Sequence, residues 1–170
     1  RTWPISGTVL MTGEILSSAV VLTLLETALG GVGLAAFWFS EGVDLPAGQT
    51  AAFGVVALVL LGTLNLMSLA IQNGAALLFP GWVRTEIRPG GVEQMGQQLL
   101  TAGVSILLLA LAVLGPGALG TAAGYLLGPL LGLWALVPAG MVAAAGLGLE
   151  LFLLFDWLGT RFERTDPAAL

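Results

Sequence analysis

Long apolar stretches alternate with short polar ones along the whole chain. Apolar residues dominate residues 9–39, 51–79, 99–114 and 118–155. These runs are continuous, whereas the strands of a membrane barrel alternate between apolar and polar residues. A helix needs about 20 apolar residues to cross a bilayer. The pattern therefore predicts an all-α integral membrane protein, a bundle of four transmembrane helices in a single domain over residues 1–170.

Polar and helix-breaking residues set the expected boundaries of these helices. An interfacial start is expected up to Glu14, and Gly115, Pro116 and Gly117 are expected to end the third helix sharply. The expected spans are residues 15–39, 51–73, 92–114 and 138–158.

The last apolar run contains one further segment. Residues 118–155 are too many for one span and few for two full spans with a loop, and Pro129 and Pro138 interrupt them. We therefore expect a short re-entrant or interfacial helical segment over residues 118–136. It should pack against the other spans, because irregular backbone at membrane depth must be covered by protein or face a water-filled cavity.

Five of the polar residues inside the expected spans are candidates for a functional site. Asn65, Ser68 and Gln72 recur at i, i+3 and i+7, which places them on one face of a helix. Glu26 lies near the middle of the first span and Glu150 deep in the fourth. A carboxylate at such a depth is costly unless it is protonated, paired, or facing protein or water. All five are candidates for a substrate path or for hydrogen bonds that hold helices together, and the second role is the commoner one for amides and hydroxyls.

Composition excludes several classes of function. The 170-residue chain is 57% hydrophobic and 9% charged, whereas soluble domains carry about 25% charged residues. Its net charge of −5 argues against a nucleic-acid partner. It has no Cys and no His, so thiol chemistry, disulfides and His-centred metal or acid–base sites are excluded. We expect no catalytic site, no metal and no cofactor, and membrane lipid as the surroundings.

The few basic residues predict an orientation. With four spans, all of them fall on one side of the membrane, and the opposite loops carry only Glu41 and Asp44. The positive-inside rule then places both termini in the cytoplasm. The basic residues are Arg1, Arg84, Arg88, Arg161 and Arg164.

The loop after the second span is a candidate docking surface. Pro80 and Gly81 break the helix, Trp82 can anchor the chain at the membrane interface, and Arg84 and Arg88 follow. The arginines could meet a cytoplasmic partner, or they could serve only topology and anionic lipid head groups.

Three segments of the chain, in order, resemble a known transporter family. They are TWPISGTVLMTGEIL from Thr2, NLMSLAIQNGAALLFPGWVR from Asn65 with GGVEQMGQQLL from Gly90, and LGTRFERTDPA from Leu158. Together they resemble the membrane (permease) subunit of a bacterial ATP-binding-cassette exporter of the type-two permease class, over the last four of its six helices. Short extracellular helices that dip back before the last span of that family would correspond to residues 118–136. Gly7 departs from the family, which has basic residues after its PIS motif.

The resemblance implies a function and partners. It implies a permease in the bacterial plasma (inner) membrane, dimeric or part of a larger complex. The chain has no GxxxxGK[ST] loop, so a separate cytoplasmic ATPase subunit would hydrolyse ATP. The alternative is a structural or accessory transmembrane subunit that packs against a larger membrane complex. The sequence leaves both open.

Overall fold

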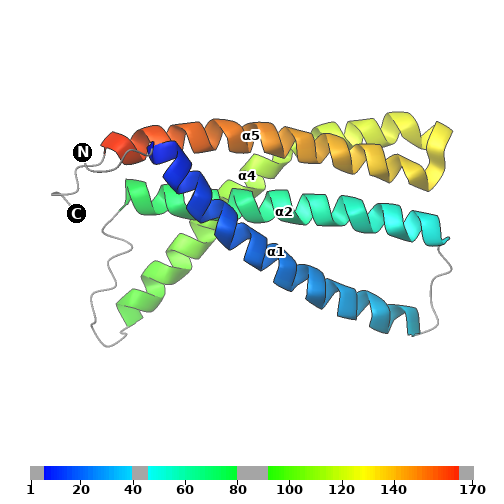
Figure 1. Ribbon diagram of the computed structural model, residues 1–170, viewed down its shortest axis with the longest axis horizontal. Coiled ribbons are helices and arrows are strands. Elements are labelled where there is room, and N and C mark those ends of the chain that lie inside the picture. The colour runs from blue at the N-terminus through cyan, green and yellow to red at the C-terminus, as the bar shows by residue number, and fades with distance from the viewer. Residues whose placement is uncertain (1–5, 40–45, 80–91, 165–170) are drawn as a thin grey trace.

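The computed structural model describes residues 6–39, 46–79 and 92–164 (Figure 1). They form four α-helices and one short 3-10 helix, and none of these residues belongs to a strand. The helices are α1 (Gly7–Phe39), α2 (Ala47–Leu78), α4 (Val92–Leu131) and α5 (Leu136–Arg164), with η1 (Gly132–Ala135) between the last two. The predicted all-α class is therefore confirmed for the described part of the chain.

Three stretches of the described helix are long and apolar enough to cross a membrane, not four as predicted. They are Gly7–Gly33, Gly48–Leu78 and Gln98–Arg164. The third has 67 residues, because α4, η1 and α5 follow one another without a polar break. It contains most of the predicted span 92–114, all of the predicted span 138–158 and the segment between them.

α4 is continuous where the sequence predicted two separate segments. It has 40 residues and includes Pro116 and Pro129. The predicted helix end at residues 115–117 is therefore wrong, and residues 118–131 continue α4 instead of forming a separate segment. A proline removes one backbone donor and favours a kink, but a membrane helix can continue through it when neighbouring groups compensate. Figure 1 shows the result: the green first half of α4 crosses the bundle at an angle, and the yellow second half runs beside α5.

Small residues bring the second half of α4 close to α5. A Cβ atom added at Gly120 would lie 2.7 Å from the carbonyl oxygen of Ala139, and one at Gly124 would lie 3.2 Å from the Ala139 Cβ. On the α5 side, a Cβ at Gly146 would lie 3.0 Å from the Cβ of Pro116. Close backbone approach through such residues is usual between membrane helices, and here it explains why α4 persists past Pro116.

The chain reverses direction at η1. Gly132 begins this short helix with a φ of 55°, which glycine adopts without the strain that other residues incur. α5 then runs back alongside α4 (Figure 1). This tight reversal replaces the predicted re-entrant segment.

The beginning of α1 and the end of α5 meet at one end of the bundle. Successive helices run in opposite directions, so these two helix ends lie together (Figure 1). The backbone N–H of Gly7 donates a hydrogen bond to Glu163 Oε1 at 2.9 Å. Gly159 is buried, and a Cβ there would overlap both the backbone and the side chain of Thr8. The two helices therefore touch at the level of their backbones.

The helices also extend beyond the predicted spans. α1 begins at Gly7, so the expected interfacial start up to Glu14 is helical, and α2 covers Ala47–Leu78. α5 continues to Arg164, with Arg161 and Arg164 in its last turn. Cations in a last turn complement the helix dipole, which favours continuing the helix past the apolar run.

The buried core is small, and much of the apolar surface is exposed. One cluster joins α1, α2 and α5 through Ile15, Met67, Ala70, Leu147, Leu151 and Leu158. By contrast, Leu126, Leu130 and Phe152 are 72%, 80% and 71% exposed. So large an apolar surface requires lipid or protein around it, as expected for a membrane protein.

Candidate functional site

Asn65 links α2 to α1 through two side chains. Its Nδ2 group donates hydrogen bonds to Thr23 Oγ1 at 3.0 Å and to Glu26 Oε2 at 2.6 Å. Asn65 is 7% exposed, whereas Thr23 and Glu26 are half-buried. Asn65 therefore points into the bundle, toward α1. Glu26 has an interhelical partner, which reduces the cost of a carboxylate in the middle of an apolar helix.

The other two residues of the predicted polar face do not reach a neighbouring helix in this way. Gln72 is exposed, and its Nε2 donates to Ser68 Oγ at 3.2 Å on the same helix. Ser68 itself is half-buried. Gln72 lies on the same face of α2 but is exposed, so this polar face is buried only in part.

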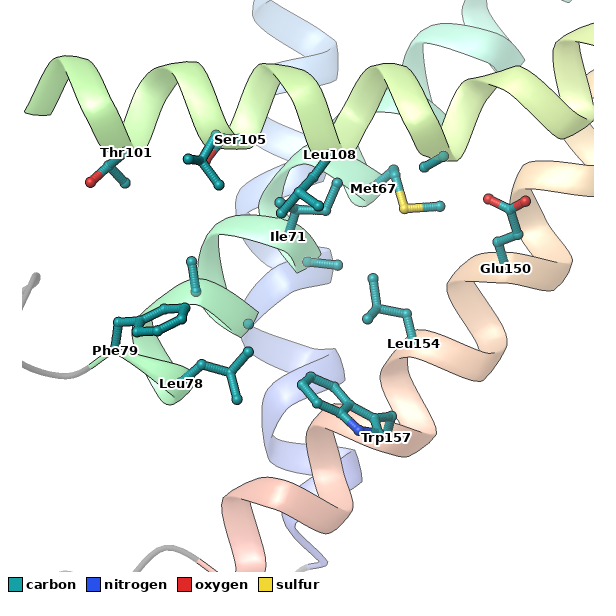
Figure 2. Close-up of a pocket in the computed structure, with 15 residues that line it drawn as sticks. Met67, Ile71, Leu78, Phe79, Thr101, Ser105, Leu108, Glu150, Leu154 and Trp157 are labelled. Atoms are coloured by element: carbon teal, nitrogen blue, oxygen red, sulfur yellow. The ribbon is translucent and has the colours of Figure 1, made fainter.

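A partly open cavity of about 330 Å³ lies between α2, α4 and α5 (Figure 2). Its walls are almost entirely apolar. Figure 2 shows Met67 and Ile71 from α2, Leu108 from α4 and Leu154 from α5 around it. α4 diverges from the bundle along its first half (Figure 1), and that divergence leaves the space open.

Glu150 is the only charged side chain among the residues that line this cavity. It is half-buried and lies near the middle of the 29-residue α5. Within the described part of the chain it makes no hydrogen bond and no ion pair. A Cβ added at Gly115 of α4 would lie 3.8 Å from its Oε1, so the carboxyl group lies at the junction of α4 and α5. Hydroxyl groups of Thr101 and Ser105 lie on the α4 wall, away from Glu150 (Figure 2).

Trp157 lines the same cavity two turns further along α5 from Glu150 (Figure 2). Glu150, Leu154 and Trp157 are spaced i, i+4 and i+7, so they lie on one face of α5 and form its part of the cavity wall. The guanidinium group of Arg161 lies over the Trp157 ring, 5.6 Å from its centroid. This cation–π arrangement holds the indole at the end of the helix.

The structure separates the two intramembrane glutamates. Glu26 contacts Asn65 at the interface of α1 and α2, and Glu150 lines the cavity at the α5 side. They are therefore not one paired site. Among the described residues no group of three or more Asp and Glu side chains is placed to hold a metal ion. The candidate docking residues Trp82, Arg84 and Arg88 lie outside the described residues.

Sequence reasoning missed Thr23 and Trp157. Thr23 lies three residues before Glu26, so helical spacing alone could have placed it on the same face. Trp157 could have been found from its spacing to Glu150. The cavity itself has no local signal, because its walls come from three segments that are distant in the chain.

Comparison with known proteins gives no match: no family model, no curated protein and no solved structure resembles this chain at a significant level. The site is therefore interpreted from its own geometry.

Proposed function

We propose that this chain is the membrane-spanning permease part of an ATP-driven exporter that works with a separate cytoplasmic ATPase. The observation that supports this best is the cavity between α2, α4 and α5, with Glu150 in its wall. Ionisable residues inside membrane helices are rare and are characteristic of substrate and ion pathways. A cavity of this kind provides a place where substrate can be held during transport.

In this proposal α1, α2, α4 and α5 each cross a bacterial plasma membrane once, with both termini in the cytoplasm. Each has at least 29 residues, more than the roughly 20 that one crossing needs. Their alternating directions support an even number of crossings (Figure 1). The one-sided arginines support the orientation.

Transport would then depend on relative movement of the three helices around the cavity. The first half of α4 is the element that diverges most from the bundle (Figure 1), so a shift of this half would widen or close the cavity. A cytoplasmic ATPase can drive such a shift only if it favours one of the two arrangements. The loop with Trp82, Arg84 and Arg88 is the proposed contact for it.

Co-purification tests the proposal. The tagged chain is isolated in mild detergent from the membranes of cells that produce it. We expect an ATP-hydrolysing subunit at a fixed ratio to the chain, with vanadate-sensitive ATP hydrolysis. The double substitution Arg84→Gln/Arg88→Gln should lose both while the chain still inserts. The control is Arg161→Gln/Arg164→Gln, which removes the same charge at the end of α5.

The alternative is an accessory subunit that only packs against a larger complex. The exposed apolar residues near the tip of the α4–α5 hairpin favour it, since they could form a protein interface. If the wild-type chain co-purifies with a membrane complex that contains no ATPase, the permease proposal is wrong and the accessory role replaces it.

A further inference from the structure

We infer that the cavity binds a small amphipathic cation, with Glu150 as its counter-ion and the apolar wall around its body. This names a substrate class for the proposed permease and rests on that proposed function. The inference begins from a carboxyl group that lies in an apolar cavity without a partner in the described part of the chain.

No described cation neutralises Glu150. The nearest described one along α5 is Arg161, about 16 Å away along the axis at 1.5 Å per residue, and its guanidinium lies over Trp157. Arg164 is one turn further. An unpaired charge in apolar surroundings is unfavourable. A ligand that carries a positive charge would pair with the Glu150 carboxylate and lower this unfavourable free energy. An anion would be repelled, and a neutral ligand would leave the carboxylate unpaired.

The shape of the cavity selects the rest of the ligand. Its volume of about 330 Å³ lies within the range of small-molecule sites. Ile71, Leu108 and Leu154 line its middle, and Trp157 adds an aromatic ring to the α5 wall (Figure 2). A ligand whose positive charge is attracted to Glu150 would therefore place its apolar or aromatic groups between these side chains.

The depth of Glu150 excludes a lipid head group as the cation. Glu150 lies about 21 Å along α5 from either end of the helix, at 1.5 Å per residue. The hydrocarbon core is about 30 Å thick, so a group in the middle of the helix lies far below the head groups of both leaflets. The ligand must therefore be a free molecule that enters the cavity whole.

Binding of two ions of the same shape and opposite charge tests the inference. The full chain is placed in lipid nanodiscs, and binding of tritiated tetraphenylphosphonium is measured above that of empty nanodiscs. We expect saturable binding of this cation and none of tetraphenylborate, an anion of matching size. Glu150→Gln, which keeps the shape and removes the charge, should weaken binding by about 10- to 100-fold, as expected for the loss of a charge–charge attraction in apolar surroundings.

Two further variants separate the charge from the cavity. Glu26→Gln removes the other intramembrane carboxylate and keeps an acceptor for Asn65, so it should bind the cation as the wild type does. Ala75→Phe fills the α2 wall and should weaken binding while Glu150 stays in place. Elution volume and helix content, measured for each variant, identify any that fails to fold. If Ala75→Phe fails in this way, Ala75→Leu, with a smaller side chain, replaces it.

The inference is overturned if the wild type does not bind tetraphenylphosphonium, if Glu150→Gln binds it unchanged, or if Glu26→Gln loses it equally. This assay needs no ATPase. A chain that co-purifies with an ATPase but binds no cation would contradict only the ligand class. A chain that binds the cation but does not co-purify with an ATPase from its own membranes would contradict the permease proposal instead.

Discussion

A single amide connects α1 to α2 in the middle of both helices. Asn65 donates to Thr23 and to Glu26, so one residue satisfies a hydroxyl and a carboxyl group of its neighbour. Hydrogen bonds between membrane helices contribute about 0.6–2 kcal/mol each. The contact also keeps the Glu26 carboxyl directed at protein, which lowers the cost of its depth in the membrane.

Replacing Asn65 by Leu should therefore destabilise the bundle. We expect a loss of about 1–3 kcal/mol in the free energy of unfolding, because both hydrogen bonds are lost and Glu26 is left without its partner. Unfolding by a denaturing detergent, followed by circular dichroism, measures it. Gln72→Leu is the matched control, since Gln72 is exposed and bonds only within α2. Equal effects of the two substitutions would disprove the interhelical role of Asn65.

Asn65 and Gln72 also show what helical spacing can predict. The i, i+7 spacing correctly places both on one face of α2. The spacing does not indicate which neighbouring helix covers each turn of that face. Thr23 and Glu26 of α1 lie opposite Asn65, and no described side chain of α1 bonds Gln72.

At the scale of elements, α4 departs most from the sequence prediction. Gly115, Pro116 and Gly117 are all unfavourable inside a helix in water, and they predicted an end. In the folded bundle Pro116 is buried and faces Gly146 of α5. Gly120 has no side chain, so the α5 backbone can approach it closely at Ala139. Tertiary packing therefore overrides local propensity, and this information lies in α5, not in the residues around Pro116.

A designed disulfide tests the α4–α5 pairing directly, because the chain has no native Cys. We expect Gly124→Cys with Ala139→Cys to cross-link under mild oxidation. The two Cβ positions are 3.2 Å apart, slightly closer than the about 3.5–4.5 Å of a disulfide, so a small outward shift of one helix brings them into range. Disulfide formation is measured as a shift of electrophoretic mobility that dithiothreitol reverses.

The control for this cross-link is Gly128→Cys with Ala139→Cys. A Cβ atom added at Gly128 would have no neighbouring atom within 4 Å, so this pair should stay reduced. Cross-linking of the control at the same rate as the designed pair would show that α4 does not continue past Pro116 in this register.

At the scale of the whole molecule, the chain is an apolar bundle whose described arginines lie at one end. Sequence alone predicted the all-α class, the long apolar helices and the polar ends of the chain, because these follow from composition and run length. It did not predict that α4, η1 and α5 form one uninterrupted apolar stretch. Nor could it predict the cavity, whose shape depends on how α4 diverges from α2 and α5.

Membrane orientation is tested by cysteine accessibility. Asp44→Cys and Arg88→Cys are introduced separately and treated with a membrane-impermeant maleimide. We expect Asp44→Cys to react in intact cells, and Arg88→Cys to react only after the membrane is permeabilised, because the proposed orientation places the arginine-rich side in the cytoplasm. Reaction of Arg88→Cys in intact cells would reverse the proposed orientation, and protection of both positions would change the number of crossings.

The contact of α1 with the last turns of α5 has a consequence for how the protein is made. Asn65 is synthesised only 39 residues after its partner Glu26, but Glu163 is synthesised 156 residues after Gly7. At about 5–20 residues per second, that second interval lasts roughly 8–30 s. Until α5 is synthesised, α2 is the helix against which α1 can pack, and the surface of Thr8 that Gly159 later covers stays uncovered. The contact between the start of α1 and the end of α5 therefore forms last. A ribosome that stops before Gly159 would release a chain in which α1 lacks this contact.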